Sequence, residues 1–242
     1  MVVATHKPKR SGPMALRRER LHPDPLAGVP TIAIVPTAWG VCGIVWKCPL
    51  VDHYLEQGHP FAEKPANALL CRIMTPGLPM PELRAYLLAM HPHAHEVLCD
   101  DHGYFHPEVV PEWLPNLVSY LQRYYTNALR DWTVPQFNDN WTYWKPRLDW
   151  AQLTEFQRKV LEVTAEIPCG LQMTYGRVAQ RIGKPGAARA VGAALGSNPW
   201  PVLVPCHRVL GTGGGMTGFS APGGVETKRR MLALEGGGLF SH

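Results

Sequence analysis

The sequence predicts an α+β protein of two domains, an α/β N-terminal domain followed by a helical C-terminal domain of helix-turn-helix outline. Apolar strand patterns alternate with helical patterns over residues 30–128, which is typical of a layered α/β domain. Residues 131–150 are rich in tryptophan, asparagine and proline and have no helical period. From Thr154 onward most apolar spacings are helical. We therefore divide the chain into a basic tail (1–28), the N-terminal domain (29–130), a connecting segment (131–152) and the C-terminal domain (153–242).

The N-terminal domain is predicted to contain a β-hairpin, a further strand and two helices. Residues 31–47 hold two apolar runs around the turn from Thr37 to Gly40, which is typical of a hairpin. Residues 66–75 form another apolar run that ends at a Pro-Gly pair, which indicates a buried strand. Residues 81–90 begin with proline, a residue suited to the first helical turn. The second helix, over residues 111–129, has an apolar side made of Leu114, Leu117, Tyr120, Leu121 and Tyr124.

The C-terminal domain is predicted to contain four helices and two short strands. Its first helix begins with Thr154 and Gln157, which have the spacing of a capping box. Two shorter helices follow, and the Gly-Lys-Pro-Gly break between them gives the outline of a helix-turn-helix unit. The expected helices cover residues 153–167, 174–183, 186–197 and 225–236, and the expected strands cover 201–205 and 216–220.

Composition restricts the class of protein. The chain is 45% hydrophobic and 18% charged, as soluble globular proteins are. It has no run of about 18 apolar residues, so we expect no membrane-spanning helix. The N-terminal tail is basic and lacks the apolar stretch of a secretory signal, so we expect it to be disordered. Six cysteines at irregular spacing indicate an intracellular protein with free thiols rather than a disulfide framework.

The charge is unevenly distributed along the chain. The net charge is +5, and residues 1–20 and 151–242 are basic whereas residues 21–150 are acidic. Basic segments can supply the phosphate attraction that a nucleic-acid-binding protein needs. They are equally compatible with an ordinary solvated surface, so charge alone leaves both interpretations open.

The helix over residues 186–197 is made almost entirely of small residues around a single arginine, Arg189. A core helix normally carries larger side chains to reach native packing density. Small residues suit a helix that approaches another surface closely, either the floor of a DNA groove or a neighbouring helix. Arg189 favours DNA, because a long planar cation can fill the gap that an extruded nucleotide leaves in the base stack. The small residues are Ala187, Ala188, Ala190, Gly192, Ala193 and Ala194.

Four stretches of the C-terminal domain carry a family resemblance. They are TYGRVAQRIG, KPGAARAVGAALGSNPWPVLVPCHRV, GMTGFSAPGG and LALEG. From about Leu153 to Gly236 the chain closely resembles the methylated-DNA–protein-cysteine methyltransferases, also called O6-alkylguanine-DNA alkyltransferases. The upstream half resembles the N-terminal domain of that family only loosely. The resemblance implies a ribonuclease-H-like N-terminal domain and a winged-helix-like C-terminal domain.

The resemblance implies an irreversible, single-turnover transfer of a methyl or small alkyl group from O6 of guanine to Cys206. Displacement at a saturated carbon needs a soft nucleophile, and thiolate is the best side chain available. His207 matches the family histidine that acts on the cysteine through a water. Glu235 matches the carboxylate that orients this histidine, in an arrangement of the general triad type. No cofactor is implied, because the alkyl group is already activated in the damaged base.

Further residues match positions of the family's site. Asn198 matches an asparagine that ties the turn after the DNA helix to the active-site loop, and it also suits a helix C-cap. Tyr175 matches a tyrosine near the flipped nucleotide; without the resemblance it would be a half-buried helix aromatic. Ser220 and Lys228 match groups that hydrogen-bond O6 or steady the leaving guanine. The other substrate-binding or DNA-binding predictions are Pro201, Val209, Phe219, Arg189, Ala187, Ala188, Ala190 and Gly192.

The chain departs from the family pattern at two places. Phe219 stands where the family often has tyrosine, so a wall of the alkyl pocket is retained while a hydroxyl contact is lost. The SAPGGV loop is longer than in the animal members, which stretches the offset between Cys206 and Glu235.

Histidines and cysteines of the N-terminal domain raise the question of zinc. Cys48 and His53 have a spacing that some zinc-bearing family members show. A structural zinc needs four placed ligands, and no complete set can be assembled from the sequence, so we predict no metal. The other side chains considered are His91, His93, His95 and Cys99.

The expected partner is double-stranded DNA that contains O6-alkylguanine, and the sequence leaves O4-alkylthymine open as a second lesion. We expect a monomer in the cytoplasm and nucleoid, or in the nucleus of a eukaryote. Two other functions compete with repair. Non-catalytic sensors of alkyl damage lack the cysteine that this chain retains. A transcription regulator would read bases in the major groove, and a stripe of alanines offers little for that hydrogen-bonding code.

Overall fold

The computed structural model describes residues 30–47, 68–105, 110–126 and 141–236. The predicted tail and the pair Cys48 and His53 lie outside these residues. The N-terminal half contains β1 (Pro30–Thr37), β2 (Gly40–Lys47), β3 (Leu69–Met74), α2 (Met80–Met90), β4 (His95–Glu96) and α3 (Leu114–Tyr125). The C-terminal half contains α5 (Glu155–Ala165), β5 (Met173–Thr174), α6 (Tyr175–Arg181), α7 (Ala188–Gly196), β6 (Val209–Leu210) and α8 (Val225–Leu234). The described residues also form the 3-10 helices η2 (Lys145–Arg147), η3 (Trp150–Gln152), η4 (Cys206–Arg208) and η5 (Thr212–Gly214).

The predicted hairpin is confirmed as β1 and β2. The two strands are antiparallel, and their register runs from the pair Pro30 and Lys47 to the pair Thr37 and Gly40. Gly40 has a φ of +119°, a backbone conformation that side chains rarely adopt, so glycine suits this turn. β3 pairs antiparallel with β2, and β4 pairs in parallel with β1. The strand order of this mixed sheet is therefore β3-β2-β1-β4.

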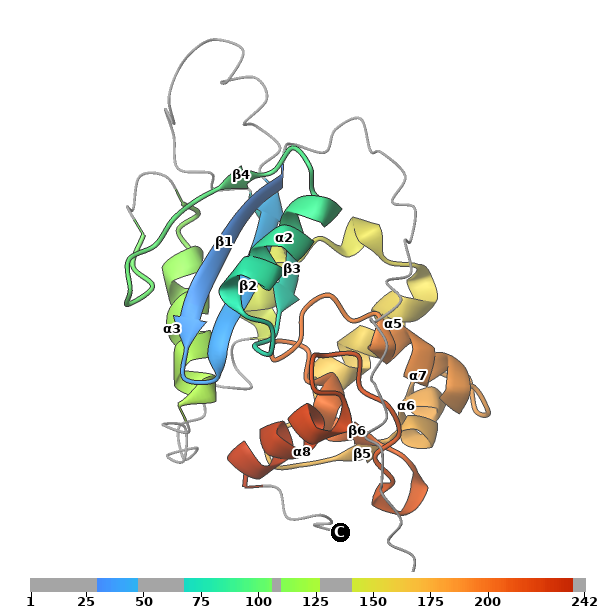
Figure 1. Cartoon of the computed structure of the whole chain (residues 1–242). Helices are drawn as coiled ribbons and strands as arrows, with labels where there is room; N and C mark the ends of the chain where they lie inside the picture. Colours follow the sequence, from blue (N-terminus) through green and yellow to red (C-terminus); the bar gives the residue numbers. More distant parts are fainter. Residues whose placement is uncertain (1–29, 48–67, 106–109, 127–140, 237–242) are drawn as a thin grey trace, which may run out of the picture.

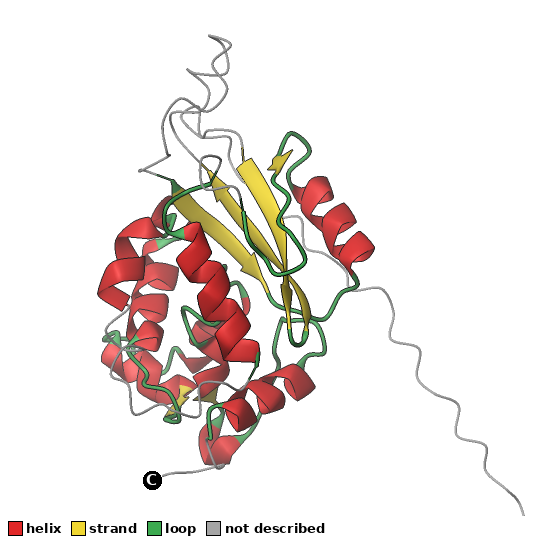
Figure 2. Ribbon diagram, turned by 90° about the vertical axis from the view of Figure 1, so that its left-hand side faces the viewer, coloured by secondary structure: helices red, strands yellow, loops and turns green. Residues whose placement is uncertain are grey.

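The sheet is covered on both faces, as the alternation of side chains along β1 requires. Ile32 and Ile34 pack into a small apolar cluster with α2. Ala33 and Val35 face the other way, into a larger cluster that includes α3 and the C-terminal half. Figure 2 shows α2 alone on one side of the sheet and most other helices on the opposite side.

The two halves of the chain share one apolar core. The larger cluster extends from β1, β2 and β3 through α3 to the helices of the C-terminal half, which lie together below the sheet in Figure 1. Trp200 is completely buried, and its Nε1 donates to the Leu70 carbonyl at 2.9 Å. The Ile73 amide donates to the Pro199 carbonyl at 2.8 Å. The loop that follows α7 is thus hydrogen-bonded directly to β3.

The helices predicted in the C-terminal half are confirmed. Thr154 and Gln157 form the capping box at the start of α5. Thr174 caps α6 by accepting a hydrogen bond from the Arg177 amide. The turn between α6 and α7 contains Gly183 and Gly186 with positive φ angles. No helix in the described ranges is both long and apolar enough to cross a membrane.

The two strands predicted over residues 201–205 and 216–220 are wrong. Residues 201–204 form turns, in which Val202 has a φ of 76° and the Val204 amide donates to the Trp200 carbonyl. Residues 216–220 have no regular structure, and β5 pairs instead with β6. The apolar residues of the first run are buried in the shared core without strand pairing.

The connecting segment is also more helical than predicted. Residues 141–144 are α-helical, and η2 and η3 follow them. Residues 131–140 lie outside the described part of the chain. Trp144 is buried in the shared core, so this part of the segment packs against the domains that it connects.

Candidate active site

The loop between α7 and β6 carries Cys206 in a fixed position. The Nδ2 of Asn198 donates to the Val204 carbonyl at 2.8 Å, and its Oδ1 accepts from the Trp200 amide at 3.0 Å. The Cys206 amide donates to the same Val204 carbonyl at 2.8 Å. Ser197 rather than Asn198 is the C-cap residue of α7. Asn198 therefore links the turn after α7 to the segment that leads into Cys206.

Cys206 is only 7% exposed, and this burial raises the pKa of its thiol above the ordinary value. The Asn198 side chain and the positive charge of Lys228 act in the opposite direction without offsetting the burial. The thiol therefore keeps its proton at neutral pH. It must give that proton to a base before it can act as a nucleophile.

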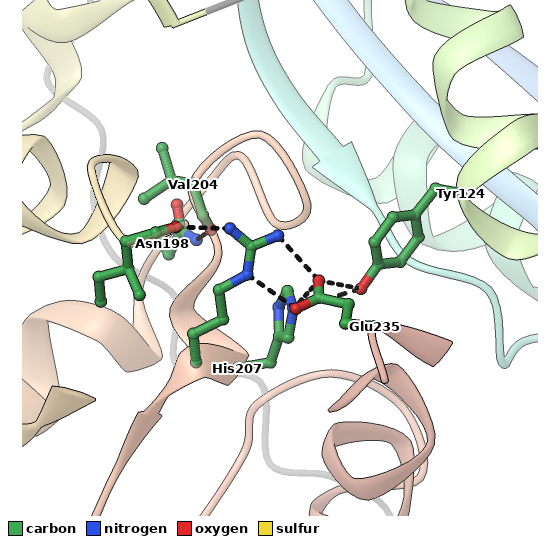
Figure 3. Close-up of polar contacts among 7 residues, drawn as sticks. Tyr124, Asn198, Val204, His207 and Glu235 are labelled. Atoms are coloured by element: carbon green, nitrogen blue, oxygen red, sulfur yellow. Dashed lines mark hydrogen bonds and ion pairs between the residues drawn. The ribbon is translucent and has the colours of Figure 1, made fainter. Parts of the chain in front are cut away.

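His207, Arg208 and Glu235 form a buried polar network, and the first two follow Cys206 directly in the chain. Figure 3 shows His207 and Glu235 in contact. His207 Nε2 lies 2.7 Å from Glu235 Oε1. Arg208 donates from Nε to Glu235 Oε2 at 2.8 Å and from Nη2 to Oε1 at 2.9 Å. Arg208 Nη1 also donates to the Ile167 carbonyl at 2.6 Å. Both oxygens of the carboxylate are thus held by a two-point arginine contact.

The charges of the network determine which nitrogen of His207 carries the ring proton. Burial alone would raise the pKa of Glu235, but His207 and Arg208 outweigh it and hold that pKa well below its usual range. Burial lowers the pKa of His207 more than Glu235 raises it, so the imidazole is neutral. An ionised Oε1 at 2.7 Å requires the ring proton on Nε2. Nδ1 is buried without a hydrogen-bond partner in the described part of the chain, and it carries the free lone pair of the ring.

Two members of this network were not predicted as site residues. Tyr124 donates its hydroxyl to Glu235 Oε1 at 3.0 Å, yet the sequence placed it only on the apolar side of a helix. Arg208 follows His207 in the stretch PCHRV, but the sequence motif alone does not indicate a function for it. A buried arginine needs a carboxylate partner. An arginine directly after an apolar run and His207 therefore indicates that a carboxylate lies close to this histidine. No comparable local signal distinguishes Tyr124 from the neighbouring tyrosines.

A cavity of about 490 Å³ opens beside Cys206, a size suited to a small-molecule group. Lys228 is buried at this cavity, and its Nζ donates to the Val209 carbonyl at 2.6 Å. Burial lowers the pKa of Lys228, and the cysteine beside it raises it. The hydroxyl of Tyr175 lies 3.5 Å from Nζ and donates to the Thr217 carbonyl. Eight predicted site residues line the cavity: Tyr175, Ala188, Arg189, Gly192, Cys206, Phe219, Ser220 and Lys228.

The other predicted residues lie around this cavity rather than in it. Asn198 and Pro201 line a second cavity of about 590 Å³, which shares Cys206 with the first and extends to β3 and α2. Val209 is fully buried. His207 and Glu235 line neither cavity. Ala187 and Ala190 also line neither; Ala187 precedes α7 as its N-cap, and Ala190 is exposed on α7.

The exposed side of α7 consists of small residues and Arg189. Val191, Ala194 and Leu195 are buried in the core. Close packing against other parts of the protein therefore explains why Ala194 is small. It does not explain why the exposed residues of the helix are small. The exposed positions of the helix are Arg189, Ala190, Ala193 and Gly196. Small side chains at these exposed positions would allow another surface to approach the helix closely.

The described residues contain no group of three or more histidine, cysteine, aspartate or glutamate side chains that could hold a metal ion. Cys48 and His53 lie outside them. The five cysteines in the described ranges are free thiols.

Comparisons with known proteins point to the same family as the motifs. Residues 155–237 match the family model for the 6-O-methylguanine DNA methyltransferase, DNA binding domain. The chain is 55% identical over 83 residues to the methylated-DNA–protein-cysteine methyltransferase of Shigella flexneri, covering 34% of this chain and 47% of that protein. The protein of the same name from Mycolicibacterium paratuberculosis is 51% identical over 82 residues, covering 34% and 48%. The family resemblance of the C-terminal half is confirmed.

The extent of these matches is limited. The chain spans about half the length of the curated relatives it matches. A solved structure, the Mycobacterium tuberculosis O6-methylguanine methyltransferase, is 24% identical with a TM-score of 0.49, covering 85% of this chain and 92% of that chain.

Proposed function

We propose that the protein repairs DNA by moving a methyl or small alkyl group from O6 of guanine to Cys206, once and irreversibly. One observation carries this proposal. A buried thiol lines a cavity of suitable size, and the next residue is a neutral histidine held by an ionised carboxylate. The family match over residues 155–237 supports the same chemistry.

In the proposed reaction Cys206 gives its proton, through a water, to Nδ1 of His207. The thiolate then attacks the saturated carbon; the S–C bond forms as the C–O6 bond breaks, and guanine leaves with that electron pair. Lys228 and Ser220 are the proposed donors to O6 as negative charge develops there. The guanine takes up one proton, which balances the proton lost by Cys206. Because the thioether product is not cleaved, each chain reacts once.

The proposed partner is double-stranded DNA, approached through its minor groove by the exposed side of α7. The small residues allow close approach, and Arg189 fills the base stack after the damaged nucleotide is extruded. Tyr175 is proposed to contact that nucleotide, and Phe219 and Pro201 to bound the space around the alkyl group. Val209 is proposed to act from behind the cavity, where its carbonyl accepts a hydrogen bond from Lys228.

The organisation proposed with this function is a winged-helix-like C-terminal domain, joined by residues 131–152 to a ribonuclease-H-like N-terminal domain. The DNA-reactive surface and Cys206 both belong to the C-terminal domain. The protein is proposed to act as a monomer in the cytoplasm and nucleoid, or in the nucleus of a eukaryote. O4-alkylthymine is the second lesion to be tested.

The proposal is tested by counting transfers per protein. Incubation with excess duplex that contains O6-methylguanine should restore at most one guanine per chain and then stop. Cys206→Ala should restore none while it still binds DNA. Cys99→Ala is the matched control, because Cys99 is a half-buried thiol of the N-terminal half that donates to the Ile34 carbonyl; it should react like the wild type. Repeated turnover, or transfer by Cys206→Ala, contradicts the proposal.

A further inference from the structure

One hydroxyl of the N-terminal half reaches the buried network of the C-terminal half. Tyr124 lies in α3 and is 1% exposed. Its hydroxyl donates to Glu235 Oε1 at 3.0 Å and lies 3.2 Å from His207 Nε2 (Figure 3). We propose that Tyr124 is a positioning residue for alkyl transfer, which holds Glu235 and thereby fixes the tautomer and orientation of His207. This inference rests on the proposed function.

The distances determine where the protons lie. An ionised carboxylate only accepts hydrogen bonds, so the 2.7 Å contact between His207 and Glu235 needs a proton on Nε2. Because Nε2 is then a donor, the single proton of the Tyr124 hydroxyl goes to Glu235. The hydroxyl oxygen is left as a second, longer acceptor for the Nε2 proton. Tyr124 therefore favours the one tautomer of His207 in which Nδ1 has a free lone pair.

Tyr124 acts on the carboxylate oxygen that matters for the base. Arg208 contacts both oxygens of Glu235, whereas Tyr124 contacts only Oε1, the oxygen that also holds His207. Burial, with the negative charge of Glu235 adding to it, raises the pKa of Tyr124 well above its usual value. The hydroxyl therefore stays protonated and remains a donor throughout the pH range in which the reaction is expected to run.

Tyr125 shows that packing alone does not explain this contact. It follows Tyr124 in α3, is 2% exposed, and packs edge-on against the Tyr124 ring with centroids 5.1 Å apart. Its hydroxyl is buried without a hydrogen-bond partner in the described ranges. Both positions use the aromatic ring to fill the core. Only at Tyr124 does the hydroxyl meet the network, so Tyr125 provides a matched control.

The test compares Tyr124→Phe with Tyr125→Phe. Each variant loses one buried hydroxyl and keeps its ring. The single-turnover rate of methyl transfer from duplex O6-methylguanine should fall roughly tenfold in Tyr124→Phe at neutral pH. The free base O6-benzylguanine should show the same loss, because proton transfer rather than nucleotide extrusion is affected. Tyr125→Phe should stay within about twofold of the wild type with both substrates.

The pH profile separates a positioning role from a structural one. The charged groups that act on His207 are Glu235, Arg208 and Lys228, and neither variant changes them. Tyr120 and Cys169, which also interact electrostatically with Glu235, are likewise unchanged. Loss of a hydrogen bond to the carboxylate strengthens its attraction for an imidazolium and raises the pKa of His207. The acid limb of the rate profile should move upward by about half a pH unit or more in Tyr124→Phe only.

Three outcomes decide the matter. An unchanged rate and pH profile in Tyr124→Phe, beside a wild type that transfers the methyl group, overturns this inference and leaves the proposed function intact. Lower thermal stability of Tyr124→Phe without a shift of the pH profile also overturns it, because the role is then structural. A wild type that transfers nothing overturns the proposed function and the inference together.

Discussion

Glu235 is the residue at which the proposed chemistry and the stability of the fold meet. Its carboxylate contacts His207 and balances the charge of Arg208, and all three residues are buried. Glu235→Gln keeps the shape of the side chain but leaves Arg208 buried without a counter-charge. We expect the free energy of unfolding, measured in urea at pH 7, to fall by about 3–5 kcal/mol.

The effect of Glu235→Gln should depend on pH. The pKa of Glu235 is lower in the folded protein than in the unfolded chain, so its stabilisation is present above the unfolded pKa of about 4.3 and is lost as the pH falls. The difference between wild type and variant should therefore shrink below about pH 4. The control is Glu226→Gln, in an exposed pair with Arg229, which should stay within about 0.5 kcal/mol at either pH. A difference that does not change with pH would rule out the charge as its source.

Motifs could identify some residues of the site and not others. Cys206, His207 and Glu235 were recognised from short stretches, and the structure brings the last two into contact. The roles assigned to them remain predictions. Tyr124 lies 111 residues before Glu235, and their contact arises because α3 packs against the C-terminal half. No local pattern of residues records such a contact.

At the scale of elements, the DNA-binding role proposed for α7 can be tested separately from the chemistry. If Arg189 fills the stack after extrusion, Arg189→Ala loses a plug worth about 2 kcal/mol. Transfer from duplex DNA should then slow roughly thirtyfold, while O6-benzylguanine, which needs no extrusion, reacts at nearly the wild-type rate. Single-turnover rates with both substrates test this prediction.

A second arginine serves as the control for Arg189→Ala. Arg229 is exposed on α8, where it pairs with Glu226. Arg229→Ala also removes one positive charge, so it corrects for the general loss of phosphate attraction. If Arg189→Ala slows transfer from duplex DNA and from the free base equally, the arginine shapes the cavity or stabilises the fold. That result would exclude a role in nucleotide extrusion.

The elements with a strong period were predictable, and the short irregular ones were not. The hairpin and the helices of both halves follow from apolar spacing and caps. The segment PVLVP failed as a strand because an apolar run indicates burial, not a backbone conformation. Its backbone forms a turn at Val202, and its apolar side chains are buried in the shared core together with Trp200. β4 has two residues and is defined only by its pairing with β1, so the sequence had no signal for it.

At the scale of the whole molecule, the shared core predicts a single cooperative unfolding transition. Buried residues of the sheet, α3 and the C-terminal helices belong to one cluster, and β3 is hydrogen-bonded to the loop before Cys206. Denaturation curves from tryptophan fluorescence and far-UV circular dichroism should therefore coincide. Two separated transitions would show that the halves unfold independently.

The sequence predicted two domains but could not show how closely they join. The change in composition over residues 131–150 marks the junction between the domains, because this segment is rich in tryptophan, asparagine and proline and has no helical period. Packing between segments far apart in the chain depends on the fit of side chains such as Trp200, which no local period encodes. For the same reason the sequence did not predict that Tyr124 of α3 contacts Glu235.

The central claim is that Cys206 itself receives the alkyl group. After incubation with O6-methylguanine duplex, the protein is digested and the mass of each cysteine-containing peptide is measured. We expect one added methylene mass on the peptide that carries Cys206 and unchanged masses for the peptides of the other five cysteines. Label on another cysteine, or restored guanine without any labelled peptide, would contradict the account.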